Sequence, residues 1–419
     1  MSGWKNDITA TYIIKRAKNA RLKLPDIAQK MADGISIGTT QEAVGTYTPK
    51  RSAINPLSPI DRKKKHKFKP GYLRASMTGF CPLGDEAVFK VKFSSQIFGE
   101  IGGFPMLMAA LVGDQFGTAY ECDSARLIDL QMPDEYIKQF PGPWFGVKGM
   151  RKLYGIKTQP MAAVLLKPNT GQSPEHYAYI AEQAACGGAS YIKDDEMKVN
   201  TKAHIAAITD KLSFVKHAQG RQTLYGPNIT VGYRYAENHV RMVVEEAGAT
   251  AIMVNAVHAG LEYVRWLVES SVVSVPIHVH RTGHDAITRG EFGMSLAVFT
   301  KLWRMAGADQ IHIGPVFGGL YRPSEIKEIF NETKLPLGHC RSSLPVISRA
   351  NVDVIQGCVD YLGTLDLLFL CDDGVYKHEH GLKAGMAEVC NLLDKVQPGT
   401  LSRRDAKYIY ENNNKVRFV

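Results

Sequence analysis

Hydrophobic residues in the second part of the chain recur as short apolar runs, and amphipathic stretches separate these runs. Each run is rich in residues that favour β-strands, and the stretch that follows it has the apolar spacing of a helix. Eight such repeats predict a (β/α)8 barrel, and an open, doubly wound sheet is the alternative with the same alternation. We favour the barrel because eight units suit closure. The predicted strands are residues 162–168, 191–196, 223–230, 251–257, 276–281, 310–315, 344–349 and 366–372.

Helix boundaries support this alternation. Ser173 is a capping residue, and Pro174 suits the first turn of a helix, so a helix is expected to begin there. Gly187 is expected to end that helix. A second helix is expected to begin at Pro323 for the same reason.

The first part of the chain lacks the alternation. Residues 86–96 alternate like a strand, residues 105–113 have a helical pattern, and residues 118–130 again resemble a strand. We therefore predict an α+β domain of ferredoxin-like type over residues 1–145, followed by the barrel domain over residues 146–419. Residues 41–75 are rich in proline and glycine and are expected to form a long loop.

Composition indicates a large globular protein in a reducing compartment. The chain has 419 residues, of which 45% are hydrophobic and 22% are charged. We find no run of 18 uncharged apolar residues and no signal-peptide core, so we expect a cytoplasmic protein without a membrane partner. The 7 cysteines are scattered without a C-x-x-C pair, which indicates reduced thiols rather than a zinc site.

A net charge of +10 narrows the choice of partners. Part of it comes from one basic run, residues 62–69, which could bind nucleic acid or an anionic surface, or could be a solvated loop. We favour the loop and expect no nucleic-acid partner, because aromatic residues do not alternate with the basic ones. A positive protein would also attract a small anionic substrate.

The catalytic groups of such barrels lie at the C-terminal ends of the strands, and many polar residues fall there. Asp195 and Glu196 offer the hard oxygen ligands that Mg2+ prefers. Lys193 between the strand and these carboxylates could be a simple ion-pair partner, or a ligand if it is modified. The candidates on the strand ends are Lys167, Lys193, Asp194, Asp195, Glu196, Asn228, His278, His280, Arg281, His284, His312, Ser348, Arg349, Asp372 and Asp373.

Two groups of these candidates suggest further chemistry. His280 and His284 could bind a metal, transfer protons or contact a phosphate. Arg281, His312 and Ser348 could form an anion-binding cradle, because a guanidinium presents a forked pair of donors.

Five segments, taken in their order along the chain, resemble the RuBisCO large-subunit superfamily. The resemblance covers most of residues 100–395. The segment from Gly187 to Glu196 resembles its activation motif, and residues 166–173 resemble the segment with a catalytic lysine, here Lys167. Residues 278–289, 311–314 and 344–348 are the other three segments of this chain that resemble the family. The resemblance implies Mg2+ bound by Asp195, Glu196 and a CO2-derived carbamate on Lys193. It also implies an acid–base role for His280 and a phosphate site at Arg281, His312 and Ser348.

Several positions depart from the pattern of carboxylating members. Asn169 replaces a second lysine, Gly319 replaces the lysine that polarises CO2, and Arg349-Ala350 replaces a pair of glycines. The glycine cluster that should end the last strand reads Asp372-Asp373, and two carboxylates would repel a phosphate. Near the N-terminus, Gly38-Thr39 matches a phosphate-contacting pair but Thr40 replaces a tryptophan, and Asp114 replaces an asparagine.

One phosphate site thus resembles the family pattern and the other does not. This combination is similar to that of the RuBisCO-like proteins of form IV. That resemblance implies an isomerase or enolase that forms an enediolate from a keto-sugar, its phosphate or a keto acid, and not a ribulose bisphosphate carboxylase. It also implies a homodimer in which Thr39 and Asp114 act on the partner's barrel. A decarboxylase or transcarboxylase of a branched sugar acid is an alternative, and so is a non-catalytic sugar-acid-binding or regulatory protein.

Overall fold

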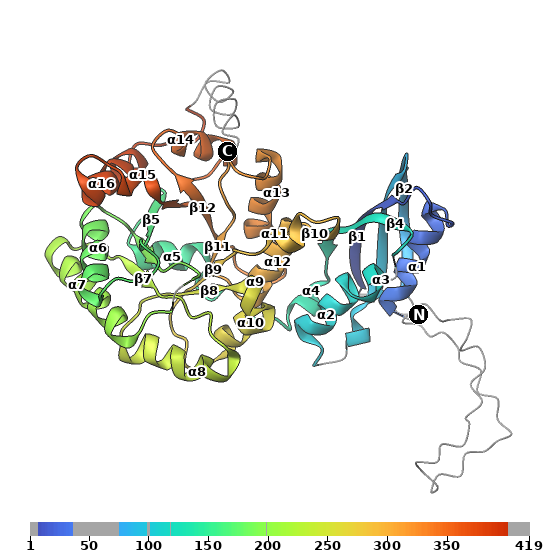
Figure 1. Ribbon diagram of the computed structural model, residues 1–419, viewed down its shortest axis with the longest axis horizontal. Helices are drawn as coiled ribbons and strands as arrows, with labels where there is room; N and C mark the ends of the chain where they lie inside the picture. The colour runs from blue at the N-terminus through green and yellow to red at the C-terminus, as the bar shows by residue number, and fades with distance from the viewer. Residues whose placement is uncertain (1–6, 37–74, 99–100, 118, 198, 401–419) are drawn as a thin grey trace, which may run out of the picture. The chain divides into compact units, whose positions relative to one another are not determined.

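A computed structural model describes residues 7–36, 75–98, 101–117, 119–197 and 199–400 (Figure 1). The basic run 62–69 and the segment Gly38–Thr40 lie outside these residues. The chain divides into two compact units, Met1–Tyr136 with Ile287–Ser295, and Ile137–Ala286 with Leu296–Val419. Within the described part of the chain, no helix is both long and apolar enough to cross a membrane.

The first unit contains a five-stranded sheet in the order β10-β4-β1-β3-β2. β1 lies between β3 and β4, and it is antiparallel to both. Its inward side chains are buried at alternate positions, such as Ile8, Ala10 and Tyr12. The elements are β1 (Asp7–Arg16), α1 (Leu24–Ser36), β2 (Ser76–Leu83), β3 (Glu86–Ser94), η2 (Ser95–Phe98), α2 (Gly103–Val112), α3 (Asp114–Gly117), β4 (Cys122–Gln131), α4 (Asp134–Ile137) and β10 (Phe292–Met294).

The sequence pattern did not predict β10. This strand has three residues, it comes from the segment between two barrel strands, and it pairs in parallel with β4. Arg126 of β4 holds the segment, because its guanidinium donates hydrogen bonds to the carbonyls of Gly290, Thr288 and Met294. A long-range pairing of so short a strand leaves no periodic signal in the sequence.

The second unit is the predicted (β/α)8 barrel, and each of the eight predicted runs overlaps an observed strand (Figure 1). All paired neighbours in the sheet are parallel, in the order β7-β6-β5-β13-β12-β11-β9-β8. A parallel bridge between Asn228 and Met253 joins the two ends of this row, so the open sheet is excluded. The strands are β5 (Met161–Leu165), β6 (Tyr191–Lys193), β7 (Leu224–Gly226), β8 (Ile252–Asn255), β9 (Ile277–His280), β11 (Gln310–His312), β12 (Leu344–Ala350) and β13 (Leu368–Cys371).

Helices surround the strands, and the two predicted helix starts are observed. The Ser173 hydroxyl accepts a hydrogen bond from the His176 amide at the start of α6, and α13 begins at Pro323. The helices are α5 (Gly146–Tyr154), α6 (Pro174–Cys186), α7 (Lys202–Gln219), α8 (Tyr233–Arg241), η3 (Met242–Glu246), α9 (Ala256–Ala259), α10 (Leu261–Glu269), α11 (Asp285–Thr288), α12 (Leu296–Ala306), α13 (Pro323–Lys334), α14 (Ile355–Leu362), α15 (Asp373–Tyr376) and α16 (Gly381–Leu393).

The N-terminal end of the barrel is filled by α5. Met150 and Tyr154 of this helix pack in one buried cluster with residues at the starts of the strands, including Met161, Leu344 and Leu368. Asp309 fixes the start of the helix, because one carboxylate oxygen accepts hydrogen bonds from the amides of Phe145 and Gly146. With this end closed by a helix, the opposite end of the strands is left for chemistry.

Polar side chains continue from this core toward the other end of the barrel. The side-chain Nε2 of Gln310 donates a hydrogen bond to the Tyr154 hydroxyl at 2.6 Å, and its Oε1 lies 3.1 Å from Nδ1 of His278. Tyr191 stacks on His278 with 5.3 Å between ring centroids. The Tyr191 ring needs the space beside Gly226, because a Cβ atom there would lie 2.1 Å from the Tyr191 hydroxyl.

We expect Gly226→Ala to lower the free energy of unfolding by about 1–3 kcal/mol, the usual cost of overpacking a close-packed interior. Denaturant unfolding measures this change. Tyr191→Phe removes the clashing oxygen, so the double variant should recover part of the loss. Gly374→Ala is the matched control, because its nearest neighbour would be 3.8 Å away. Equal stability of the Gly226 and Gly374 variants would contradict this packing.

Candidate functional site

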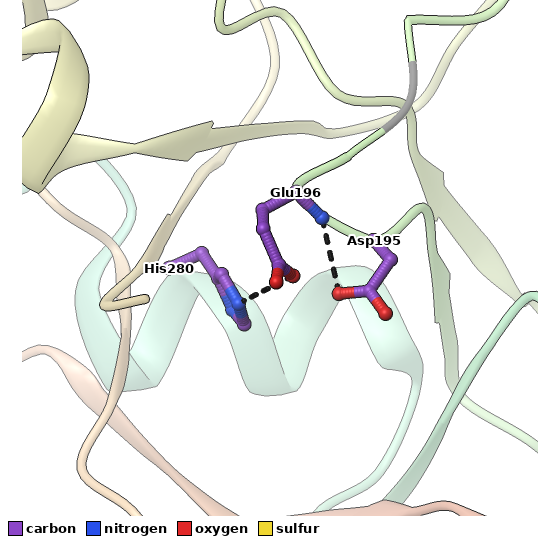
Figure 2. Close-up of side chains that lie close together, drawn as sticks. All are labelled: Asp195, Glu196 and His280. Atoms are coloured by element: carbon purple, nitrogen blue, oxygen red, sulfur yellow. Dashed lines mark hydrogen bonds and ion pairs between the residues drawn. The ribbon is translucent and has the colours of Figure 1, made fainter. Parts of the chain in front are cut away.

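Three potential metal-binding side chains meet at the C-terminal ends of two barrel strands. Asp195 and Glu196 are the second and third residues after β6, and His280 is the last residue of β9. One donor atom from each lies within 4.8 Å of the other two. Figure 2 shows the Glu196 carboxylate between the Asp195 carboxylate and the His280 ring. Two carboxylates and an imidazole at this spacing can hold a divalent cation.

Asp194 directly precedes Asp195 in sequence but is buried in a separate network. Its carboxylate accepts hydrogen bonds from the Tyr225 hydroxyl at 2.8 Å, from the Asn200 amide at 2.7 Å and from the backbone amide of Asn228 at 3.1 Å. The Asn228 side chain donates to the carbonyl of Glu196 at 3.0 Å. Asp194 and Asn228 therefore fix the backbone that presents Asp195 and Glu196.

Lys193 has no exposed surface and extends into the barrel interior. Its Nζ donates a hydrogen bond to the carbonyl of Asp194 at 2.9 Å. Burial lowers the pKa of Lys193 to about 8, although the neighbouring carboxylates of Asp195 and Glu196 oppose this shift. A substantial neutral fraction of this amine therefore exists near pH 8.

Lys167, two residues after the first barrel strand, reaches the same cluster. Its Nζ lies 2.6 Å from a carboxylate oxygen of Asp195 and 2.7 Å from the side-chain oxygen of Asn169. Burial favours a raised pKa for Asp195, but hydrogen bonding to Glu196 and the charges of Lys193 and Lys167 hold it well below its usual range. Asp195 is therefore an anion at neutral pH.

Burial and the adjacent Asp195 raise the pKa of Glu196. Its carboxylate lies 3.1 Å from Nε2 of His280, and the Thr282 hydroxyl lies 2.7 Å from the same nitrogen. Burial, followed by the charge of Lys193, holds the pKa of His280 well below its ordinary value. His280 is therefore a neutral imidazole at neutral pH, which suits either metal binding or proton transfer.

A pocket of about 260 Å³ adjoins this cluster at the ends of β9, β11 and β12. It brings together the three side chains that the sequence suggested as an anion-binding cradle, and it places His284, Tyr321 and Arg349 beside them. Its lining residues are Arg281, Thr282, Gly283, His284, Asp285, His312, Pro315, Gly319, Leu320, Tyr321, Ser348 and Arg349.

Arg281 supplies positive charge to this pocket. Its Nη1 has no hydrogen-bond partner among the described residues, and burial lowers its pKa to about 10, so it stays protonated at neutral pH. The guanidinium lies against Gly314, where a Cβ atom would be 2.3 Å from Nη2. Such a buried cation requires an anion or solvent to satisfy its donors.

Two histidines border the guanidinium. Nδ1 of His312 lies 3.2 Å from Nδ1 of His280, and burial holds the pKa of His312 well below its ordinary value. The buried His284 contacts the Tyr321 hydroxyl at 3.4 Å and a carboxylate oxygen of Asp285 at 3.7 Å. His312 thus links the metal-binding cluster to the pocket.

The remaining candidates do not line this pocket. Asp373 forms an exposed ion pair with Lys377 at 2.7 Å, whereas burial and the charge of Asp373 raise the pKa of Asp372. The two aspartates therefore have different surroundings and do not form one carboxylate wall. Asp114 begins α3 in the other compact unit.

The structure adds residues that the sequence reasoning did not single out as functional. Thr282 contacts His280, Tyr225 and Asn200 hold Asp194, and Tyr321 borders the pocket. Thr282 follows directly after two candidate residues, so its position was a usable signal. Asn200 is only six residues beyond Asp194, whereas Tyr225 and Tyr321 come from other strand and loop segments that the barrel fold brings near the site.

Comparison with known proteins identifies the family. Residues 146–412 match the model of the ribulose bisphosphate carboxylase large chain, catalytic domain. A ribulose bisphosphate carboxylase-like protein of Bordetella bronchiseptica is 33% identical over 400 residues, which cover 91% of this chain and 90% of the relative.

Solved structures agree with this match. The octameric ribulose-1,5-bisphosphate carboxylase/oxygenase of Pyrococcus horikoshii has a TM-score of 0.80 and 25% identity, over 99% of this chain and 95% of that one. A rubisco-like protein of Burkholderia fungorum shares the fold with a TM-score of 0.79 and 22% identity, over 99% of this chain and 100% of that one. The chain therefore belongs to the RuBisCO large-chain family, in which its relatives include RuBisCO-like proteins.

Proposed function

We propose that this protein is a RuBisCO-like enzyme of form IV that enolises a small keto-sugar, its phosphate or a keto acid with the help of Mg2+. One observation carries the proposal. The carboxylates of Asp195 and Glu196 lie beside a buried, easily deprotonated Lys193, and an anion-binding pocket containing Arg281 adjoins them. A metal-binding group next to an anion anchor suits a substrate with a charged end and a reactive carbonyl.

The donor atoms fit Mg2+, which prefers carboxylate oxygens and retains positions for other oxygen ligands. Asp195 and Glu196 would hold the ion. Lys193 would join them after its neutral amine attacks CO2, which forms a C–N bond, releases a proton and replaces a potential cation by a carbamate anion. The pKa of Lys193, lowered to about 8, supports this reaction. When bound, Mg2+ would stabilise negative charge on the substrate's carbonyl oxygen.

Enolisation also requires a group that removes a proton next to the carbonyl. Lys167 Nζ lies 2.6 Å from a carboxylate oxygen of Asp195, and Nε2 of the neutral His280 ring lies 3.1 Å from one of Glu196. We assign proton transfer to these two side chains, with the Lys193 carbamate as a further candidate base. Asp195 would hold the Lys167 ammonium in a fixed position near the bound substrate. Proton transfer needs such a position, because the group must stay within hydrogen-bond reach of the atom that gains or loses the proton.

The substrate would place its anionic group against Arg281, His312, His284 and Ser348. Asp372 would disfavour a second anion, and the exposed pair of Asp373 with Lys377 takes Asp373 out of this role. We therefore propose a substrate with one anionic end. A decarboxylation or carboxyl transfer would share the same enediolate, so these reactions remain the alternative outcome of the same site. We further propose a homodimer as the smallest assembly, supported by the octameric state of the archaeal relative.

Mg2+ binding should depend on CO2 through Lys193. At a fixed concentration of dissolved CO2, calorimetry should show Mg2+ affinity rising with pH around a midpoint near 8, because only the neutral amine reacts. Lys193→Ala should abolish the dependence on CO2. Lys202→Ala should retain it, because Lys202 is an exposed residue paired with Glu246. CO2-dependent Mg2+ binding in the Lys193 variant would refute the assignment.

Catalysis should appear as proton exchange even before the natural substrate is known. In D2O with Mg2+, a panel of ketose monophosphates and 2-keto acids should contain a compound that gains deuterium next to its carbonyl, as measured by mass spectrometry. Removal of Mg2+ by EDTA should stop the exchange. Lys167→Met should slow it by about 100-fold or more, the usual contribution of a general acid or base.

Lys202→Met serves as the control for the loss of one lysine and should exchange at the unsubstituted rate. A panel member that binds but never exchanges, with Mg2+ and CO2 present, would favour the non-catalytic binding protein.

Ribulose bisphosphate should not be carboxylated. Gly319 has no ammonium that could polarise CO2, and Asp372 opposes a second phosphate. Labelled bicarbonate should therefore enter phosphoglycerate no faster than in a blank without protein. Incorporation that disappears in Lys193→Ala would show that the site carboxylates after all.

A further inference from the structure

Arg349 has a backbone conformation that an arginine rarely adopts. Its φ of 53° makes it the single non-glycine residue with positive φ among the residues that the structure describes. A side chain destabilises this left-handed conformation, and glycine adopts it freely. The pairing of β12 with β13 shifts register between Ile347 and Ala350, so Ser348 and Arg349 form an irregularity in the strand. Such irregularities redirect side chains beside active sites.

The redirected side chain reaches the anion-binding pocket. Arg349 lines it together with Arg281 and Ser348. Its Nη1 donates a hydrogen bond to the carbonyl of Gly318 at 3.3 Å, on the loop that follows β11. The two guanidiniums are close enough for the charge of Arg349 to disfavour the protonated form of Arg281. The placement of Arg349 is therefore unfavourable in two ways: its backbone conformation is strained, and its charge repels that of Arg281.

We infer that Arg349 is the second cation of a two-arginine clamp and that it makes the pocket selective for a dianionic head group such as a phosphate monoester. A phosphate monoester carries a charge of about −1.5 to −2 at pH 7, whereas a carboxylate carries one negative charge. Two forked guanidiniums can each bind a different edge of a phosphate. Asp285 also lines the pocket, and its charge favours the protonated form of Arg281, but the two guanidiniums outnumber this one carboxylate.

The inference rests on the proposed function only in that the Arg281 pocket binds the substrate's anion. It adds Arg349 as a residue that makes this pocket prefer a dianion over a carboxylate. It also assigns Arg349 a second task, because its bond to Gly318 ties the loop after β11 to the strand that carries Ser348. An unfavourable conformation retained beside a binding pocket is typical of a residue whose role is functional.

Calorimetry with inorganic phosphate and with acetate as probes tests the clamp. Arg349→Gly removes the guanidinium and relieves the backbone, so the dissociation constant for phosphate should rise about tenfold or more. The dissociation constant for acetate should change less, and the melting temperature should not fall. Arg349→Gln should weaken phosphate binding similarly while keeping a long polar side chain. Arg322→Gln controls for the loss of one positive charge at an exposed site.

The outcomes separate this inference from the proposed function. Arg281→Ala should weaken the binding of both probes. If it weakens phosphate binding and Arg349→Gly does not, the clamp is overturned and the anion pocket stands. If Arg281→Ala leaves phosphate binding unchanged, or the unsubstituted protein binds no phosphate, the anion pocket fails and the clamp fails with it.

Discussion

The burial of the Lys193 amine among carboxylates is the interaction on which the site depends. An ammonium in the barrel interior loses its hydration, and the shift of its pKa from 10.5 to about 8 corresponds to a cost of about 3 kcal/mol. Because the folded-state pKa is depressed, this cost is fully present below pH 8 and disappears as pH rises toward 10.5. The fold bears this cost, and as a result a substantial fraction of the amine is neutral near pH 8. The same burial fixes the direction from which Asp195 and Glu196 meet Lys193.

Closure of the barrel makes that burial possible. Helix α5 fills one end, and the chain of Tyr154, Gln310 and His278 leads from its core toward the other. The buried network around Asp194 holds the turn after β6, so the two following carboxylates have a fixed position. The polar groups of the interior thus stabilise the geometry of the site more than they stabilise the fold.

Much of this arrangement could be predicted from the sequence. Strand and helix patterns identified the barrel, because each strand is a separate apolar run with a recognisable helix after it. The rule that catalytic groups follow parallel strands then brought Arg281, His312 and Ser348 to one pocket before any contact was known. The structure places these three together with His284.

The remaining features depend on backbone detail or on long-range contacts. The sequence could not separate Asp372 from Asp373, because their surroundings depend on a local turn and on Lys377. The strained conformation of Arg349 and its contact with Gly318 have no signature in composition or periodicity. Strand β10 pairs with β4, in which its partner Ala125 lies more than 150 residues away in sequence. No local sequence pattern therefore predicts this strand.

The central claim is that Lys193 reacts as a neutral amine with CO2 and becomes an anionic ligand. Carbon-13 NMR of the protein with labelled bicarbonate and Mg2+ tests it most directly. The account predicts one carbamate signal that is stabilised by Mg2+, weakens below pH 8 and is absent from Lys193→Ala. A spectrum without a carbamate signal at pH 8.5, or a signal that persists in Lys193→Ala, would contradict it.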